Sequence, residues 1–181
     1  TVIGGNIEEV NRGWFSDGPP NLAAFSYFQD LAVDSAGNIY VADTGNSLIR
    51  KISPEFTVTT IAGNGPACTK MLCSRAEFQT PPQKNTIIAI NADCDILICP
   101  TGSKDGLANS ARFNYPNGLT LDGKGNIYIA DTGNNSIRKV SSDGIVSTIA
   151  SVDSPIDVVV DRQGNLYCTS ASKSVIYQIK L

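Results

Sequence analysis

Histidine is absent from this 181-residue sequence, and charged residues make up only 17% of it. Because histidine is the commonest general base and a usual zinc ligand, its absence argues against the enzyme classes that depend on it. No apolar run approaches the length needed to span a bilayer, so we expect no membrane-spanning segment. With 14 Lys and Arg against 17 Asp and Glu, the chain is also a poor candidate for binding nucleic acid.

Helical periodicity is also missing, and short segments of alternating polarity take its place. The stretch DSAGNIYVADTGNSLIRKI at 34–52 returns almost unchanged as DGKGNIYIADTGNNSIRKV at 122–140. A weaker copy begins at Ser154, and the most degenerate copy begins at Thr80. Each good copy divides at its turn residues into four strand-like pieces, which predicts the four-stranded antiparallel blade of a β-propeller.

We therefore expect one all-β domain over residues 1–181 with about four blade equivalents, one of them degenerate. The blade-like segments are expected at roughly 25–63, 78–102, 113–150 and 154–181, with residues 1–5 as an outer strand. The degenerate copy keeps two strand-like pieces, and the last copy keeps three. Either the N-terminal strand completes the last blade of a four-bladed ring, or the chain is part of a larger propeller; we favour the second.

The segment PNGLTLDGKGNIYIADTGNNSIRKV at 116–140, with the lead-in DGLANSARFNYP before it, resembles the NHL repeat. The resemblance covers two copies strongly, a third partly and a fourth faintly. It implies an NHL-type β-propeller, which usually has six blades. It does not imply one activity, because family members bind proteins, peptides or RNA, and some related propellers are enzymes.

The polar residues inside the repeat are predicted to be structural. A set of catalytic residues normally occurs at one place in a fold, whereas these residues recur in each good copy. The arginine on the third strand is expected to hold neighbouring carbonyls or a carboxylate. The residues of this structural repeat motif are Asp43, Asn46, Arg50, Asp131, Asn134 and Arg138.

Candidate partner-binding residues lie where the copies differ. In a four-stranded meander, the loop leading into the first strand and the turn between strands two and three share one face. This loop-rich face collects the long loops 6–24 and 64–77, and loops carry function more often than cores do. The candidates for contact with a partner are Trp14, Phe15, Met71 and Leu72. For the two aromatic residues, packing into the blade is the competing interpretation.

Five cysteines leave several pairings open. Cys68 with Cys73 and Cys94 with Cys99 are two pairs spaced by four residues, whereas zinc sites prefer a spacing of two. A disulfide within the first loop or between the two segments is expected if the protein is secreted, and free thiols otherwise. Cys168, in a strand-like segment, is expected to be a core thiol. The Asn134-Asn135-Ser136 tripeptide is a glycosylation acceptor only in a secreted protein, and an extracellular location is favoured without being determined.

Together these features predict a non-catalytic interaction module or scaffold that presents its loop-rich face to a protein, peptide or glycan. Other chains or blades of a larger assembly are further candidate partners, and no cofactor is expected. The alternative is a propeller enzyme of the gluconolactonase type, to which the resemblance to related propellers points, with a divalent metal near the axis. Asp30 and Asp157 lie where a central site of this kind could form. RNA binding is a distant third.

Overall fold

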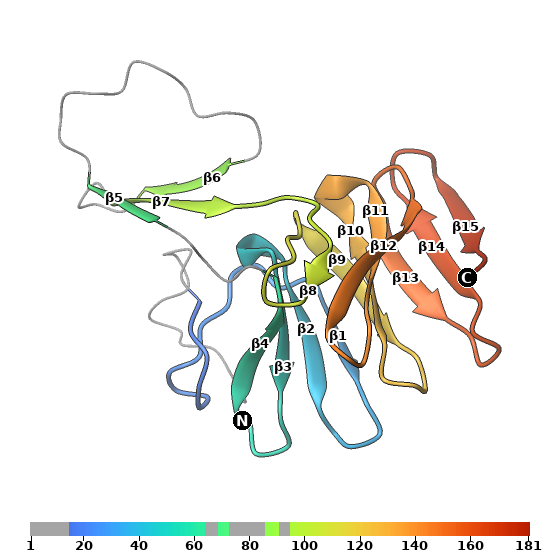
Figure 1. The fold of residues 1–181 in the computed structure, drawn as a ribbon, viewed down its shortest axis with the longest axis horizontal. Helices are drawn as coiled ribbons and strands as arrows, with labels where there is room; N and C mark the ends of the chain where they lie inside the picture. The colour runs from blue at the N-terminus through green and yellow to red at the C-terminus, as the bar shows by residue number, and fades with distance from the viewer. Residues whose placement is uncertain (1–14, 64–68, 73–85, 91–94) are drawn as a thin grey trace.

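The computed structural model describes residues 15–63, 69–72, 86–90 and 95–181, with only the backbone described between 69 and 100. The described part is built from antiparallel sheets, and the expected all-β fold with four-stranded blades is confirmed. Three sheets stand side by side in an arc that does not close into a ring, and a fourth lies outside the arc (Figure 1). The arc is therefore part of a propeller.

The first blade is a four-stranded meander in which each strand pairs with the next. A short 3-10 turn, η1 (Thr44–Asn46), joins its second and third strands. The strands are β1 (Asp30–Val33), β2 (Ile39–Asp43), β3 (Leu48–Ile52) and β4 (Val58–Ala62).

The central blade repeats this order and adds a short fifth strand at its outer edge, on β12. Its corresponding 3-10 turn is η2 (Thr132–Asn134). The strands are β8 (Gly106–Leu107), β9 (Pro116–Leu121), β10 (Ile127–Asp131), β11 (Ser136–Val140) and β12 (Ile145–Ser151).

The last blade has three described strands, β13 (Pro155–Val160), β14 (Leu166–Ser170) and β15 (Val175–Ile179). These are the three strand-like pieces that the last copy keeps. The expected outer strand at residues 1–5 lies outside the described residues.

A small sheet is formed by β5 (Thr69–Leu72), β6 (Thr86–Ile90) and β7 (Asp95–Pro100), in the order β5-β7-β6. β6 and β7 are the two strands expected of the degenerate copy. The segment 64–77 was expected to be a loop, and this is wrong for β5, which pairs antiparallel with β7. β5 thereby takes the position on β7 that a third strand takes in the complete blades.

Spatial order differs from chain order. The first and central blades are direct neighbours, and the small sheet lies outside the arc beyond them (Figure 1). The first strands β1, β9 and β13 run side by side along the inner edge of the arc. Each of these strands consequently faces its counterpart in the next blade.

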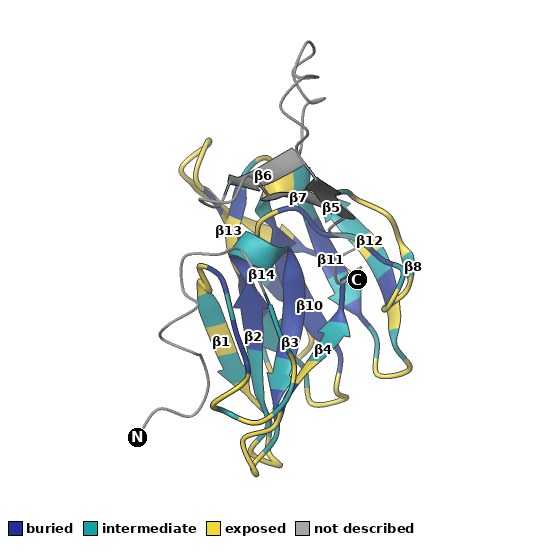
Figure 2. Ribbon diagram, turned by 90° about the vertical axis from the view of Figure 1, so that its left-hand side faces the viewer, coloured by how far each residue is buried: buried dark blue, intermediate teal, exposed yellow. Residues whose placement is uncertain are grey.

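Apolar side chains from neighbouring blades form two cores. Ala42 and Ile49 of the first blade pack with Leu119 and Ile129 of the central blade. Ile137, on the opposite face of the central blade, lies in a second cluster that includes side chains of the last blade. Figure 2 shows the buried residues concentrated in the strands inside the arc. Every residue of β10 is buried, because this strand is covered on both faces.

Hydrogen bonds at the inner edge link successive blades. The hydroxyl of Thr44 donates to the carbonyl oxygen of Pro116 at 2.6 Å, and that of Thr132 donates to Pro155 at 2.6 Å. Gly118 allows a still closer approach, because a β-carbon there would lie 2.6 Å from the Cα of Asp157. The repeat therefore specifies the spacing between blades as well as the strands within them.

We predict that Gly118→Ala destabilises the fold by about 1–3 kcal/mol, since the added methyl group overlaps backbone atoms that cannot move independently. Chemical denaturation would measure the change in the free energy of unfolding. Gly123→Ala is the matched control, because a β-carbon there meets nothing within 4 Å. Equal midpoints for the two variants would contradict the packing described for Gly118.

Candidate functional site

Arg138 is the centre of a buried polar network at the lead-in to the central blade. Its Nη1 donates to the Asp131 carboxylate at 2.7 Å and to the carbonyl oxygen of Arg112 at 3.0 Å. Its Nη2 donates to the Asp105 carboxylate at 2.6 Å and to the carbonyl oxygen of Lys104 at 3.1 Å. The guanidinium also lies over the Phe113 ring, 5.1 Å from the ring centroid. One side chain thus holds the whole lead-in loop against β11.

Asp131 completes this network from the end of β10. Its carboxylate accepts hydrogen bonds from the backbone N–H of Asn114 at 2.8 Å and from the side-chain amide of Asn134 at 2.7 Å. Burial raises the pKa of Asp131, and the hydrogen bonds and the charge of Arg138 oppose that rise. Both charged side chains are fully buried, so neither is available to a ligand.

The first blade repeats the arrangement. Arg50 donates to the Asp43 carboxylate at 2.8 Å, to the Asp17 carboxylate at 2.8 Å and to the carbonyl oxygens of Ser16 and Ala24. Its side chain and that of Asp43 have no exposed surface. The repeated polar residues therefore connect a lead-in loop to its blade in both complete copies.

Asn134 uses its amide group inside the same network. Its Nδ2 donates to the carbonyl oxygen of Gly102 at 2.7 Å and to Asp131 at 2.7 Å. An attached glycan would replace one of the two hydrogens on this nitrogen and would break at least one of these bonds. The acceptor tripeptide is therefore explained by the fold.

A surface groove lies on the opposite face, between the short turns of the central and last blades. It has a volume of about 1050 Å³, and Asp122 and Asp161 are among its lining residues. Asp122 accepts hydrogen bonds from the N–H groups of Lys124 and Asn126 and from the Asn126 amide. Burial alone would raise the pKa of Asp122, but these hydrogen bonds hold it below its usual value. Asp161 makes the equivalent bonds in its own turn, so both carboxylates are committed to turn structure.

Asp30 and Asp157 lie on the inner strands β1 and β13, as a central site would require. The Asp30 carboxylate accepts the backbone N–H groups of Leu31 and Leu119, each at 2.8 Å. That of Asp157 accepts the N–H of Val158 at 2.8 Å. Within the described part of the chain, no group of three or more Cys, Asp or Glu side chains is arranged to hold a metal ion.

Exposed aromatic side chains are found on the loop-rich face instead. Tyr27, Phe28 and Tyr115 are 79%, 61% and 47% exposed. Tyr27 and Tyr115 occupy equivalent positions just before β1 and β9, and both have the left-handed backbone conformation, with φ of 48° and 51°. This conformation is uncommon for a bulky residue.

The turn between β2 and β3 connects these two tyrosine positions. Gly45 donates its N–H to the carbonyl oxygen of Ser26 at 2.8 Å, next to Tyr27. The N–H of Tyr115 donates to the hydroxyl of Ser47 at 3.4 Å. The two tyrosines therefore flank one rigid turn. We call Tyr27, Phe28 and Tyr115 the aromatic row.

The sequence did not single out the aromatic row, although a signal was present. SYF at 26–28 and NYP at 114–116 place a tyrosine at the same position of both good copies, and the third copy has Ser154 there. Recurrence alone does not distinguish an exposed residue from a packing residue. Only their exposure distinguishes them from Phe113, which is buried nearby.

Of the four residues predicted to contact a partner, only Phe15 has a side chain that the structure describes. Trp14 lies outside the described residues. Phe15 is half-buried, with the Arg50 guanidinium 5.3 Å from its ring centroid. Met71 and Leu72 belong to β5, whose side chains are not described.

The cysteines are described only in part. Cys68, Cys73 and Cys94 lie outside the described residues, and Cys99 belongs to β7. A disulfide among these four stays a prediction. Cys168 is a buried free thiol of the second core, and burial, with the nearby charge of Asp157, raises its pKa to about 11.

Comparison with known proteins identifies the repeat. The sequence profile described as NHL repeat matches residues 25–52 and 113–140, which include β1–β3 and β9–β11.

The chain contains NHL repeats.

A relative and a solved structure place these NHL repeats in context. Teneurin-3 of Mus musculus is 31% identical over 114 residues, which is 61% of this chain and 3% of Teneurin-3. A structural genomics protein of unknown function from Bacteroides thetaiotaomicron has a similar fold, with a TM-score of 0.54 and 24% identity. That likeness covers 78% of this chain and 32% of the other. The chain thus spans only a small part of the first protein and about a third of the second.

Among the described residues, no helix is long and apolar enough to cross a membrane.

We predict that Arg138→Met lowers the free energy of unfolding by about 3–5 kcal/mol, because it leaves Asp131 buried without its counter-charge. Urea denaturation would measure the loss. Lys173→Met is the matched control: Lys173 and Asp153 form an exposed ion pair at 3.5 Å, whose loss is expected to cost at most about 1 kcal/mol. The double variant Asp131→Asn with Arg138→Met should cost less than the two single changes added together, since no buried charge is then left alone. Simple additivity would contradict a coupled pair.

Proposed function

We propose that this chain is a non-catalytic interaction module that binds a protein or peptide through its loop-rich face. The observation that carries the proposal is the contrast between two sets of side chains in the repeats. The charged residues that resemble a catalytic set are buried and paired with each other, as Asp131 and Arg138 are. The aromatic row is exposed on the same face.

The chemistry of the aromatic row suits recognition. Tyrosine provides a large, rigid contact surface together with a hydroxyl group, and it is enriched among the residues that dominate binding energy at interfaces. The turn between Tyr27 and Tyr115 is held by the bond from the Gly45 N–H to the Ser26 carbonyl oxygen and by the bond from the Tyr115 N–H to the Ser47 hydroxyl, so the two tyrosines are positioned before a partner arrives. Pre-organisation of this kind lowers the entropy lost on binding. The same rings could stack on sugar rings, which makes a glycan the alternative ligand.

Lead-in segments belong to the same proposed surface. Trp14 comes directly before the segment that Arg50 holds against the first blade. Met71 and Leu72 lie in the cysteine-bearing segment that follows the first blade in the sequence. We propose that these residues extend the aromatic row.

A gluconolactonase-type site is the weaker candidate. It would need inner carboxylates free to bind a divalent metal, yet Asp30 accepts two backbone N–H groups and Asp157 accepts one. RNA binding is weaker still, because acidic residues outnumber basic ones and the net charge is −3.

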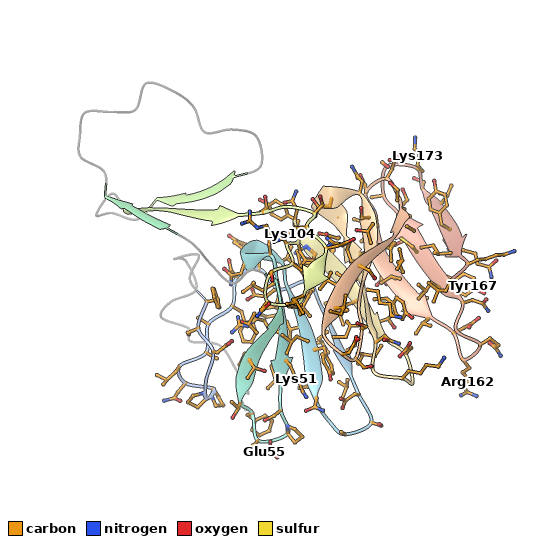
Figure 3. The ribbon with its side chains drawn as sticks, viewed as in Figure 1. Lys51, Glu55, Lys104, Arg162, Tyr167 and Lys173 are labelled. Atoms are coloured by element: carbon orange, nitrogen blue, oxygen red, sulfur yellow. The ribbon has the colours of Figure 1, made fainter. Side chains whose placement is uncertain are left out.

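We predict that Tyr27→Ser combined with Tyr115→Ser weakens partner binding at least about tenfold while leaving the fold intact, since both side chains are largely exposed. The tagged chain would first isolate partners, and interferometry with each purified partner would then compare dissociation constants. Phe56→Ser is the matched control, because Phe56 is 41% exposed in the turn between β3 and β4, on the opposite face; Glu55 marks this turn in Figure 3. Equal losses in both variants, or none in either, would overturn the assignment of the face.

Metal titration tests the enzymatic alternative. We predict that calcium or manganese leaves the midpoint of thermal unfolding unchanged, because a ligand raises that midpoint only if it binds the folded chain. A rise that disappears in Asp30→Asn or Asp157→Asn would support the metal site instead.

A further inference from the structure

Two short turns border the groove on the face opposite the aromatic row. The turn between β9 and β10 contributes Asp122 and Lys124 to its lining, and the turn between β13 and β14 contributes Asp161 and Arg162. Lys124 and Arg162 are both exposed, and Figure 3 shows Arg162 at the tip of its turn. Lys180, directly after β15, is a third cation among the lining residues. The two blades therefore each present a cation to the groove between them.

The hydrogen bonds that build these turns do not use the cationic side chains. In all three blades, one aspartate accepts two backbone N–H groups, an asparagine amide and a tyrosine hydroxyl. These aspartates are Asp34, Asp122 and Asp161. In the first blade, Ala36 stands at the position of Lys124, and Ser35 stands at that of Arg162. Because the same turn forms there without either cation, the fold does not explain Lys124 and Arg162.

Neither cation is neutralised within the described part of the chain, where Lys124 and Arg162 form no ion pair. The nearby carboxylates do not take this role. A carboxylate has about four lone-pair sites, and Asp122 and Asp161 each accept the four hydrogen bonds of their own turn. Lys124 and Arg162 consequently remain available to an anion from outside.

Two apolar side chains lie at the base of these turns. Leu121 ends β9 and Val160 ends β13, and these strands run side by side along the inner edge of the arc. Both residues line the groove and are half-buried. We call the space lined by Leu121, Val160, Lys124 and Arg162 the basic groove. It is open to solvent and has a volume of about 1050 Å³, so it suits an extended chain better than an enclosed small molecule.

We propose that the basic groove binds an acidic peptide segment of a partner protein, with an aliphatic residue between its acidic residues. The acidic side chains pair with Lys124 on one side and Arg162 on the other, and the aliphatic side chain packs on Leu121 and Val160. Charge complementarity carries this assignment, because two unpaired cations on separate blades favour a ligand with more than one negative charge. Arginine in particular matches the geometry of a carboxylate.

Nucleic acid is the less suitable polyanion for this groove. Proteins that bind single strands combine positive charge with aromatic side chains on which the bases stack. The aromatic residue that lines the basic groove is Tyr128, which is 3% exposed and donates its hydroxyl to Asp122 at 3.3 Å. No ring is therefore free for stacking on a base.

A defined peptide tests the proposal with the whole chain. The probe is a capped, fluorescently labelled peptide with two glutamates on each side of a central leucine and a glycine at each end. We predict that the chain binds this probe in fluorescence polarisation at low salt, and that raising the salt from about 20 to about 300 mM weakens binding, because exposed charges are screened. Replacing the leucine of the probe by serine should also weaken binding. In nuclear magnetic resonance spectra, the probe should shift the amide signals of Gly123 and Gly164, which line the groove.

Matched variants locate the site. Lys124→Gln combined with Arg162→Ser installs the residues that other turns carry at these positions, so the fold should be kept. We predict that this variant binds the probe at least about fivefold more weakly. Lys104→Gln combined with Lys173→Ser removes the same two charges from the loop-rich face, and it should change the affinity by less than about twofold. Figure 3 shows Lys173 and Arg162 at opposite ends of the last blade.

Four outcomes would overturn the proposal. The first is no binding of the probe by the natural chain up to millimolar concentration at low salt. The second is an equal loss in both double variants, which would indicate a response to net charge alone. The third is equal affinity for the leucine and serine probes, and the fourth is tighter binding of an oligouridylate through Lys124 and Arg162. Tyr27→Ser with Tyr115→Ser should leave probe binding unchanged, so the basic groove and the aromatic row are tested independently.

Discussion

A blade with two apolar faces must be covered on both, and this constraint organises the molecule. A four-stranded sheet cannot hide both faces by itself, so blades stack, and stacking brings their first strands together at the inner edge. β10 is buried along its whole length because it lies between two other blades. Ile137, which the last blade covers, is fully buried, whereas Ile176 at the equivalent position of the last blade is 72% exposed. Contact with a neighbouring blade, and not residue type alone, therefore decides how far such a side chain is buried.

Within a blade, the second requirement is to fix the lead-in loop. Arg138 and Arg50 do this by donating to two carboxylates and two carbonyl oxygens each, and both arginine side chains are fully buried. A buried ion pair contributes little net stability but specifies one arrangement, because every alternative leaves a charge unpaired. The network also positions the residues just before the first strand, among them the tyrosines of the aromatic row. The buried polar network and the exposed aromatic row thus lie on one face of the propeller.

Much of the fold could be predicted from the repeated segments 34–52 and 122–140. The turn residues and alternating segments located the four repeated strands of both complete blades, whereas the short fifth strand β8 of the central blade was not predicted. The recurrence of Asp, Asn and Arg indicated a structural role. β5 was missed because its segment resembles no strand of the repeat, and it pairs only through a partner distant in sequence. The aromatic row was missed because exposure is not periodic: Tyr115 and Phe113 are neighbours in the same lead-in, yet only one is covered.

The sequence by itself determined the blade, its four strands, its turns and the family, since these depend on local alternation and on residues that recur at set spacings. Only the tertiary structure decided which blades are neighbours, which side chains another blade buries and which polar groups are already hydrogen-bonded. Those properties depend on contacts between residues far apart in the chain, such as Asp30 with Leu119 and Gly118 with Asp157. The sequence alone does not show why a strand contains a glycine. The structure shows that Gly118 is needed because the backbone of another blade, at Asp157, lies against it.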